Sequence, residues 1–199
     1  LQELPGVECD VTRGIVGVVE GDLPIGGLSS SAAVTVAYLL ALEAANGQSK
    51  VGSWGHGFAR PDGRLGGYGM MNAPGLPLTI SLIQAREAGG DDPKLDEAIE
   101  KSARLLRFYI GKGAVPYGDH HPWTETHEDN GKCGMAAVMF NLLGEAEGAE
   151  FFSRMSVASH GAERDSGHTG NFFNMLWAIP GVARSGPHAS GAWMRANPH

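Results

Sequence analysis

The sequence predicts a mostly α-helical protein in which helical hairpins stack into a partial α/α barrel or solenoid, behind a short β-loop-α segment. Apolar residues recur at steps of three and four through residues 95–109, which is the pattern of one buried helix face. Polar, Gly-rich loops separate such helical stretches over the second part of the chain. Helical hairpins that cannot bury both faces alone stack on one another, which favours this architecture.

The composition is that of a globular protein with many turns. The 199 residues are 42% hydrophobic and include 30 Gly and 11 Pro. A net charge of -7, with no basic block, argues against nucleic acid as a partner. The longest strongly apolar stretch, Ala32 to Ala45, is too short to cross a membrane. Because the chain begins at Leu1 and shows no leader, we expect a processed or excised piece and predict no compartment.

A change of composition near residue 50 divides the chain into two predicted units, residues 1–48 and residues 51–199. All 8 His and all 4 Trp lie from Trp54 onward, whereas the first 50 residues hold only Arg13 and Lys50 against six acidic side chains. Two units of different origin are the simplest account of this change. A single domain whose aromatic residues cluster stays open as the alternative, because length alone favours one domain.

The first unit is predicted to be a strand, a glycine loop and a helix. The strand covers residues 12–20, where β-branched residues are frequent, and the loop covers residues 21–28. Ser29 to Ser31 supply capping hydroxyls for a helix from Ala32 to Ala45, which Asn46 and Gly47 end. This arrangement aims several free backbone N–H groups at one point, where a phosphate binds well. An ordinary capped helix after a tight turn is the alternative.

The string from Gly21 to Ala33, Gly-Asp-Leu-Pro-Ile-Gly-Gly-Leu-Ser-Ser-Ser-Ala-Ala, resembles the ATP-binding loop of the GHMP small-molecule kinases, particularly the galactokinase-like branch. The resemblance implies ATP and Mg as cofactors and phosphoryl transfer to a sugar or a similar alcohol. Neither the early Arg nor the catalytic Asp of that family has a recognisable counterpart here, so we expect weak nucleotide binding without kinase turnover. The resemblance places these residues around the phosphates: Gly26, Gly27, Leu28, Ser29, Ser30 and Ser31.

The second unit is predicted to consist of helices that follow polar loops. An Asn lies near the start of three of these helices, at Asn72, Asn130 and Asn171, which forms a weak internal repeat. The sequence predicts helices over Leu76–Glu87, 95–109, Cys133–Leu143, Ala146–Met155 and Asn171–Ala178, the last of them ended by Pro180-Gly181, and a short helix over Ser190–Arg195.

Three loops of the second unit hold most of the side chains that can do chemistry, and we expect them to converge on one face. They cover residues 54–58, 120–130 and 159–168. One interpretation is acid/base chemistry on a carbohydrate or uronate, with aromatic rings as stacking platforms. Helix caps and ordinary packing are the alternative. The proton carriers would be His127 or His168, their partners Glu125 or Glu163, and the platforms Trp54, Tyr68 and Trp123.

A zinc site is the competing interpretation of the same loops. Imidazole, thiolate and carboxylate groups are the ligands that zinc accepts, and the region offers Cys133, Asp129, His127, His160 and His168. The paired spacings CxxC and HExxH are both missing from the sequence. We therefore predict no metal ligands here.

Strings between Val51 and Trp193 resemble an uncharacterised bacterial family whose helical repeats look like the α/α toroids of prenyltransferases, terpene cyclases and polysaccharide lyases. The strings are Val-Gly-Ser-Trp-Gly-His-Gly-Phe from residue 51, His-Pro-Trp-Thr-Glu-Thr-His-Glu-Asp-Asn-Gly-Lys from residue 121 and His-Thr-Gly-Asn-Phe-Phe-Asn from residue 168. The resemblance implies an incomplete α/α toroid, because such toroids use more hairpins than this chain has room for. We expect a partner or an oligomer to cover the open toroid face.

The composite interpretation is an ATP-binding or phosphate-binding fragment of a GHMP-type sugar kinase fused to a helical toroid domain, without recognisable kinase catalysis. One alternative is a non-catalytic helical binding or scaffold module, in which the glycine loop only caps a helix. The other is a carbohydrate-acting toroid hydrolase or lyase that works from the His-rich loops. The kinase-fragment interpretation predicts a nucleotide as the partner, and the hydrolase or lyase interpretation predicts a carbohydrate. Both are small molecules.

Overall fold

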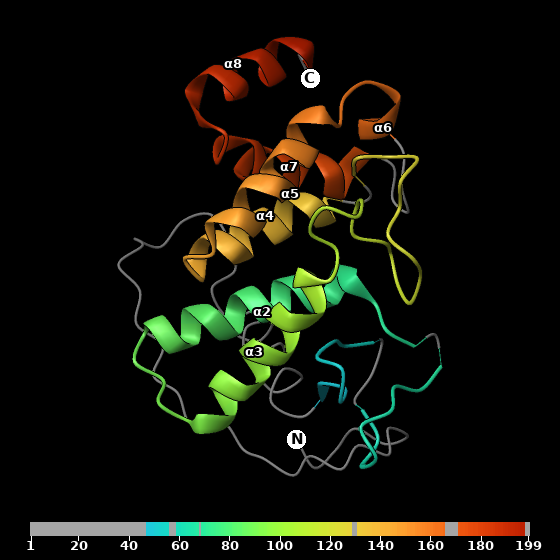
Figure 1. Ribbon diagram of the computed structural model, residues 1–199, viewed down its shortest axis with the longest axis vertical. Coiled ribbons are helices and arrows are strands. Elements are labelled where there is room, and N and C mark those ends of the chain that lie inside the picture. The colour runs from blue at the N-terminus through green and yellow to red at the C-terminus, as the bar shows by residue number, and fades with distance from the viewer. Residues whose placement is uncertain (1–46, 56–58, 68, 129–130, 166–170, 198–199) are drawn as a thin grey trace, which may run out of the picture.

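The computed structural model describes residues 47–55, 59–67, 69–128, 131–165 and 171–197, and these residues are mostly helical (Figure 1). Their extended segments form only isolated antiparallel bridges, so the predicted mostly-α class is confirmed. The predicted strand, glycine loop and helix of residues 12–45 lie outside the described residues. The helices are α2 (Asn72–Glu87), α3 (Pro93–Arg107), α4 (Lys132–Leu142), α5 (Ala146–Ala158), α6 (Ala162–Asp165), α7 (Asn171–Ala183) and α8 (Gly186–Ala196).

The described helices pair into three hairpins that stack on one another. α2 packs on α3, α4 on α5, and α7 on α8. The first helices of the hairpins are neighbours in series, because α4 contacts α2 on one side and α7 on the other. Figure 1 shows the α2–α3 hairpin below, α4, α5 and α7 above it, and α8 at the far end. Among these helices, none is long and apolar enough to span a bilayer.

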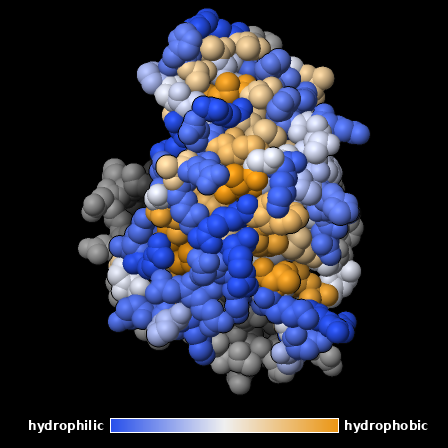
Figure 2. Space-filling view, in the orientation of Figure 1, coloured by the Kyte–Doolittle hydropathy of each residue, from blue (hydrophilic) through white to orange (hydrophobic). Residues whose placement is uncertain are grey.

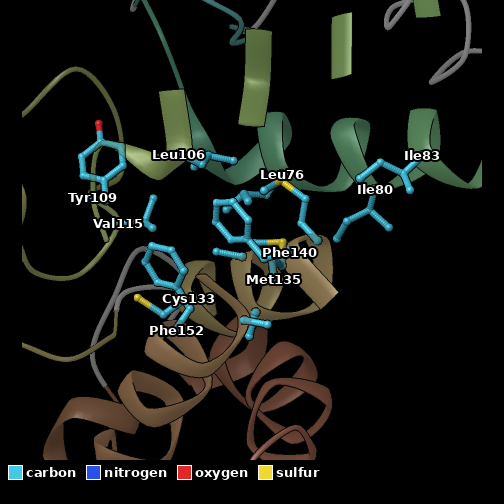
Figure 3. Packing of buried hydrophobic residues seen from close by; sticks show 14 of the residues in the cluster. Leu76, Ile80, Ile83, Leu106, Tyr109, Val115, Cys133, Met135, Phe140 and Phe152 are labelled. Atoms are coloured by element: carbon cyan, nitrogen blue, oxygen red, sulfur yellow. The ribbon is translucent and has the colours of Figure 1, made fainter. Parts of the chain in front are cut away.

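The main core lies between α2 and the α4–α5 hairpin. Leu76 and Ile80 of α2 belong to the same buried cluster as Met135 and Phe140 of α4 (Figure 3). The ring of Phe140 stacks on that of Phe152 of α5, with centroids 5.7 Å apart and planes at 5°. Such close packing of fully buried side chains makes the core sensitive to any change of volume.

α4 and α7 cross at two glycines, which lets their backbones approach closely. A Cβ atom on Gly134 would collide with the backbone carbonyl of Trp177, and one on Gly181 would lie 2.6 Å from Cα of Gly134. Neither position therefore has room for a side chain. The crossing fixes how the third hairpin sits on the second.

Two helices are longer than predicted. α2 begins at Asn72 rather than Leu76, and α7 continues through Pro180 to Ala183 rather than ending at Ala178. Proline deprives the carbonyl four residues earlier of its helical donor, and in α7 that carbonyl belongs to Leu176, which lies on the exposed side of the helix. The sequence also missed α6, and the predicted short helix over Ser190–Arg195 covers Gly186–Ala196.

An arginine joins the first two hairpins at their edges. Arg107 of α3 donates hydrogen bonds from Nε to Glu145 Oε2 at 2.8 Å and from Nη1 to Glu100 Oε1 at 2.8 Å. The hydrogen bond from Arg107 is the main reason why the pKa of Glu100 is lowered from its ordinary value of 4.5. The two carboxylates in turn raise the pKa of Arg107.

We expect Arg107→Gln to raise the pKa of Glu100 towards 4.5, since the chief stabilising hydrogen bond is lost. A folded-state pKa below the unfolded value stabilises the protein above the unfolded pKa, and this contribution is lost as the pH falls through the folded pKa. Wild type should therefore lose more stability on acidification than Arg107→Gln. NMR titration of the Glu100 carboxyl carbon and urea unfolding at neutral and acid pH measure the two effects. Lys94→Gln, which removes one exposed charge from the same helix, should leave the titration unchanged.

Candidate functional site

The segment of residues 112–128, which precedes α4, lies against the segments that precede α2 and α7. Met71 forms a bridge with Gly118, and the backbone N–H of Asn72 donates to the carbonyl of Tyr117 at 2.9 Å. Further along the same segment, His127 contacts Glu163 of α6, the short helix before α7. Figure 1 shows this segment running along the side of the molecule on which α6 lies. The segment before α4 therefore contacts the segment before α2 and the segment before α7, at two different places along its length.

His127 and Glu163 form a hydrogen-bonded pair across 36 residues of sequence. Nδ1 of His127 lies 3.0 Å from Oε2 and 3.1 Å from Oε1 of Glu163. The backbone N–H of His127 donates to Glu163 Oε2 at 3.2 Å, so the carboxylate is held at two points of one residue. Half of the His127 side chain is exposed to solvent, whereas Glu163 is more covered. A partly covered carboxylate that orients an exposed imidazole is an arrangement found in acid/base pairs.

The geometry of this pair fixes which imidazole nitrogen holds the proton. An ionised carboxylate only accepts hydrogen bonds, so the neutral ring of His127 has its proton on Nδ1. Nε2 then has the free lone pair and is the atom that can take a proton from a ligand or water. Glu163 would stabilise the imidazolium that results.

α6 is held in place from α7 and from the end of α8. Asn174 of α7 is fully buried, and its Nδ2 donates to the carbonyls of Glu163 and Arg164 at 3.4 and 3.3 Å. Arg164 Nη1 donates to Oδ1 of Asn197 at 2.9 Å. These contacts position Glu163 although its own helix has only 4 residues.

Glu128, next to His127, is a buried carboxylate at the start of α4. It is 1% exposed, and its two oxygens accept hydrogen bonds from the backbone N–H groups of Cys133 and Gly134, each at 2.9 Å. These amides belong to the first turn of the helix, where N–H groups have no helical acceptor and the helix dipole favours negative charge. Glu128 therefore fixes the chain immediately after His127 to a rigid helix.

Asn72 and Tyr109 hold the beginning of the same segment. Nδ2 of Asn72 donates to the carbonyl of Pro116 at 2.9 Å, and Asn72 also hydrogen bonds to the Tyr109 hydroxyl. Burial raises the pKa of Tyr109; the bond to Asn72 offsets part of this shift and the nearby charge of Asp119 adds to it. The phenol therefore stays protonated throughout the physiological range.

An open cleft of about 590 Å³ lies on this segment, and it is lined by Asp119, His120, His121, Pro122 and Trp123. It is open to solvent, and all of its lining residues are consecutive in one segment. Trp123 is half-buried and packs against the main core, so its ring is held while it also lines the cleft. His127 lies four positions after Trp123, and an extended chain over that interval reaches about 14 Å. The cleft and the His127–Glu163 pair are thus within that distance of each other along the backbone.

The other predicted site residues differ in whether they are exposed, buried or outside the described residues. Glu125 is exposed and forms no ion pair with any residue in the described ranges. Trp54 was predicted as a stacking platform, and this is wrong, because its side chain is completely buried against Leu78 and cannot touch a ligand. His168, Tyr68 and the whole predicted phosphate loop, Gly26 to Ser31, lie outside the described residues.

The zinc interpretation gains no support from the part of the chain that the structure describes. Within that part, no three His, Cys, Asp or Glu side chains lie close enough to hold a metal ion. Cys133 is fully buried at the start of α4, whereas His160 is exposed. Asp129 and His168 lie outside the described residues.

Sequence reasoning did not assign a role to Glu128, Asn72 or Tyr109. Glu128 had a usable signal, because an acidic residue shortly before a predicted helix start is a common way to cap the first turn. Asn72 was noticed only as a repeated Asn near a helix start, and its contact with Tyr109 joins residues too distant in sequence to be paired by pattern.

A family model described as a domain of unknown function (DUF6288) matches residues 35–198, which is most of the chain. The match begins after Ser31 and therefore does not include the predicted phosphate loop. No curated protein and no solved structure was found to match the chain.

Proposed function

We propose that this chain, which belongs to the DUF6288 family, is a carbohydrate-acting hydrolase or lyase that works from the segments before α4 and α7. The observation that supports this proposal is the pairing of His127 with Glu163. Two segments distant in sequence supply an exposed imidazole and the carboxylate that orients it. Such pairs serve general acid/base catalysis, which is the step that a hydrolase and a lyase share.

In either reaction, Nε2 of His127 would accept the proton. A hydrolase would use it to activate the water that attacks the glycosidic carbon, while the bond from that carbon to the leaving sugar oxygen breaks and this oxygen takes a proton from solvent. A lyase would use it to remove the proton from the carbon next to a uronate carboxylate; the bond from the neighbouring carbon to the leaving sugar oxygen then breaks, a carbon–carbon double bond forms, and the imidazolium returns its proton to that oxygen. Glu163 holds the ring through Nδ1 in both cases and stabilises its charged form.

The cleft on the same segment supports a sugar as the ligand. Trp123 offers an apolar ring face, and Asp119 with His120 and His121 offers groups that bond to hydroxyls. Carbohydrates present both kinds of surface, whereas a purely apolar ligand would leave these polar groups unpaired. The cleft is open, which suits a polymer that extends beyond it.

We further propose that the three hairpins are part of an α/α toroid. This is supported by the order of neighbours, in which the first helices α2, α4 and α7 are adjacent in series and their second helices follow them. The segment before α4 also contacts the segments before α2 and α7, and a toroid would gather ligand-binding groups in such segments. Nucleotide binding by Gly26 to Ser31 stays a separate prediction from the sequence, on which this proposal does not depend.

The test is an assay of the full chain on a panel of polymers, with polygalacturonate and alginate as uronates and xylan and β-glucan as less acidic ones. New ultraviolet absorbance from unsaturated uronates indicates a lyase, and new reducing ends without it indicate a hydrolase. His127→Ala should lower kcat by about 10²–10⁴-fold, because a general acid/base group is lost. Glu163→Gln should lower kcat as well, since the carboxylate that stabilises the imidazolium is gone.

His188→Ala is the matched control, because His188 is an exposed histidine of α8 with no place in the site. It should retain the wild-type rate. Equal rates for His127→Ala and His188→Ala would contradict the assignment of the base. A wild-type chain that turns over no polymer of the panel would overturn the proposal in favour of a helical binding or scaffold module.

A further inference from the structure

Most of α8, the last described helix, lies outside the core of the protein. Trp193 is its only buried residue, at 3% exposed, and Asn197, which directly follows the helix, is also 3% exposed. The remaining residues of α8 are exposed or half-buried. Figure 2 shows hydrophilic and moderately hydrophobic side chains mixed over the end of the molecule where α8 lies. The buried contacts of α8 are therefore concentrated at its C-terminal end.

The indole of Trp193 connects α8 to the chain between α5 and α6. Its Nε1 donates to the carbonyl of Ser159, which directly follows α5, at 3.1 Å. Trp193 also belongs to the same buried cluster as Ala178 and Val182 of α7, so the indole is held from a second helix. A buried indole N–H usually has a partner, and this partner is backbone that leads into α6. Trp193 thus fixes the chain on the N-terminal side of α6.

Asn197 connects the end of α8 to α6 itself. Its Nδ2 donates to the carbonyl of Trp193 at 2.7 Å, and its Oδ1 accepts from Nη1 of Arg164 at 2.9 Å. An amide is suited to this position because it has a donor on one side and an acceptor on the other. Arg164 follows Glu163 in α6. Asn197 therefore holds the residue next to the carboxylate that orients His127.

A helix as short as α6 does not fix its own position. It has 4 residues, and forming a single helical turn is unfavourable because one hydrogen bond does not offset the loss of backbone freedom. The place of Glu163 therefore depends on contacts from other elements. The end of α8 supplies two of them, at Ser159 and at Arg164, which lie on either side of Glu163 in the sequence.

We propose that Trp193 and Asn197 are positioning residues, which hold Glu163 where its carboxylate meets Nδ1 of His127. The catalytic meaning of this inference rests on the proposed function, in which His127 is the base. Glu163 keeps the proton of the neutral ring on Nδ1 and so leaves Nε2 free. If α6 moves, the ring loses this acceptor, and the tautomer with its proton on Nε2 becomes populated.

Nitrogen-15 NMR of the full chain, with the His127 ring in its neutral form, locates the proton and needs no substrate. Wild type should show the Nδ1–H tautomer. Asn197→Leu keeps the size of the side chain but loses both hydrogen bonds, and Trp193→Phe keeps a ring but loses the donor. Both should shift the tautomer towards Nε2–H. Asn197→Asp keeps the acceptor for Arg164 and should retain the wild-type tautomer.

The rate of polymer cleavage is the second measurement. Asn197→Leu and Trp193→Phe should lower kcat by about 10–100-fold, because a small displacement of a catalytic group has effects of this size. KM should be unchanged, since the residues that line the cleft belong to the segment before α4 and not to α6. Asn197→Asp should keep a kcat close to that of wild type.

Ser102→Ala is the matched control, because it removes a buried hydrogen bond far along the chain from α6. Oγ of Ser102 in α3 donates to the carbonyl of Gly52 at 2.6 Å, and Ser102 is 1% exposed. Urea unfolding should show that Ser102→Ala is folded but less stable than wild type, as are the variants at the end of α8. The control should change neither kcat nor the tautomer of His127.

Two results would overturn the proposal. The first is an unchanged Nδ1–H tautomer in both Asn197→Leu and Trp193→Phe; if one of the two does not fold, the other decides. The second is a shift of the tautomer in Ser102→Ala as large as theirs, because the effect would then follow stability and not position. A tautomer that shifts as expected in a chain that cleaves no polymer would support the positioning of Glu163 and refute the proposed function.

Discussion

Replacing Gly134 with Ala is expected to lower the free energy of unfolding by about 2–3 kcal/mol. The new methyl group would collide with the backbone carbonyl of Trp177 in α7. Gly181, also in α7, faces Gly134 as well. Backbone atoms cannot rotate away as a flexible side chain does, so α4 and α7 have to move apart. Because total stabilities are only about 5–15 kcal/mol, this is a large loss. Urea unfolding followed by circular dichroism measures it.

Gly191→Ala is the matched control, since Gly191 is also a helix-interior glycine. Its added methyl group would meet only the end of the Arg195 side chain, at 3.4 Å. Helix propensity should then dominate and stabilise the protein by up to about 1 kcal/mol. The two substitutions are chemically identical and should have opposite signs. A Gly134→Ala variant as stable as Gly191→Ala would contradict the close crossing of α4 and α7.

Replacing Glu128 with Ala is expected to cost about 3 kcal/mol, because two buried N–H groups lose their acceptor. The amides of Cys133 and Gly134 would remain inside the protein without the carboxylate that now lies 2.9 Å from each. The first turn of α4 should fray, which hydrogen exchange of these two amides would show as a loss of protection. Urea unfolding gives the total effect.

Glu125→Ala tests whether the effect belongs to the buried position. Glu125 lies three residues earlier in the same segment and is exposed, so its loss should change the free energy of unfolding by less than about 0.5 kcal/mol. Glu128→Gln keeps the shape of the side chain but turns an N–H₂ group towards one of the amides, and we expect most of the loss to remain. Unchanged amide protection in Glu128→Ala would contradict its role as the cap of α4.

Which stretches form helices could be predicted from the sequence, because side chains spaced three and four residues apart form the buried side of the helix in the structure. The spacing within residues 95–109 predicted one buried helix face, and Ile99, Ser102 and Leu106 of that stretch are buried in α3. Helix ends were less predictable: the predicted start of α2 was Leu76 rather than Asn72, and Pro180 was taken as the end of α7. Whether Pro180 ends a helix depends on whether the carbonyl of Leu176 reaches water, which only the packed structure shows.

The candidate site was predictable in its residue types but not in its pairings. His127 and Glu163 both came from the His-rich loops, yet Glu125 and Glu163 were equally good partners by sequence, and the position of α6 decides between them. Trp54 looked like Trp123 in the sequence, but burial separates a core residue from one that lines a cleft. Neither distinction can be made from the neighbouring residues in the sequence, because both depend on the tertiary structure.

The tethering of the segment before α4 has a consequence for redesign. Hydrogen bonds join Tyr117 and Glu128 of this segment to helix starts, and the ten residues between them, 118–127, include the cleft and His127. A foreign sequence of the same length grafted between these two points would inherit both anchors. New binding specificities could then be installed by exchanging one short cassette while the helical scaffold is left as it is.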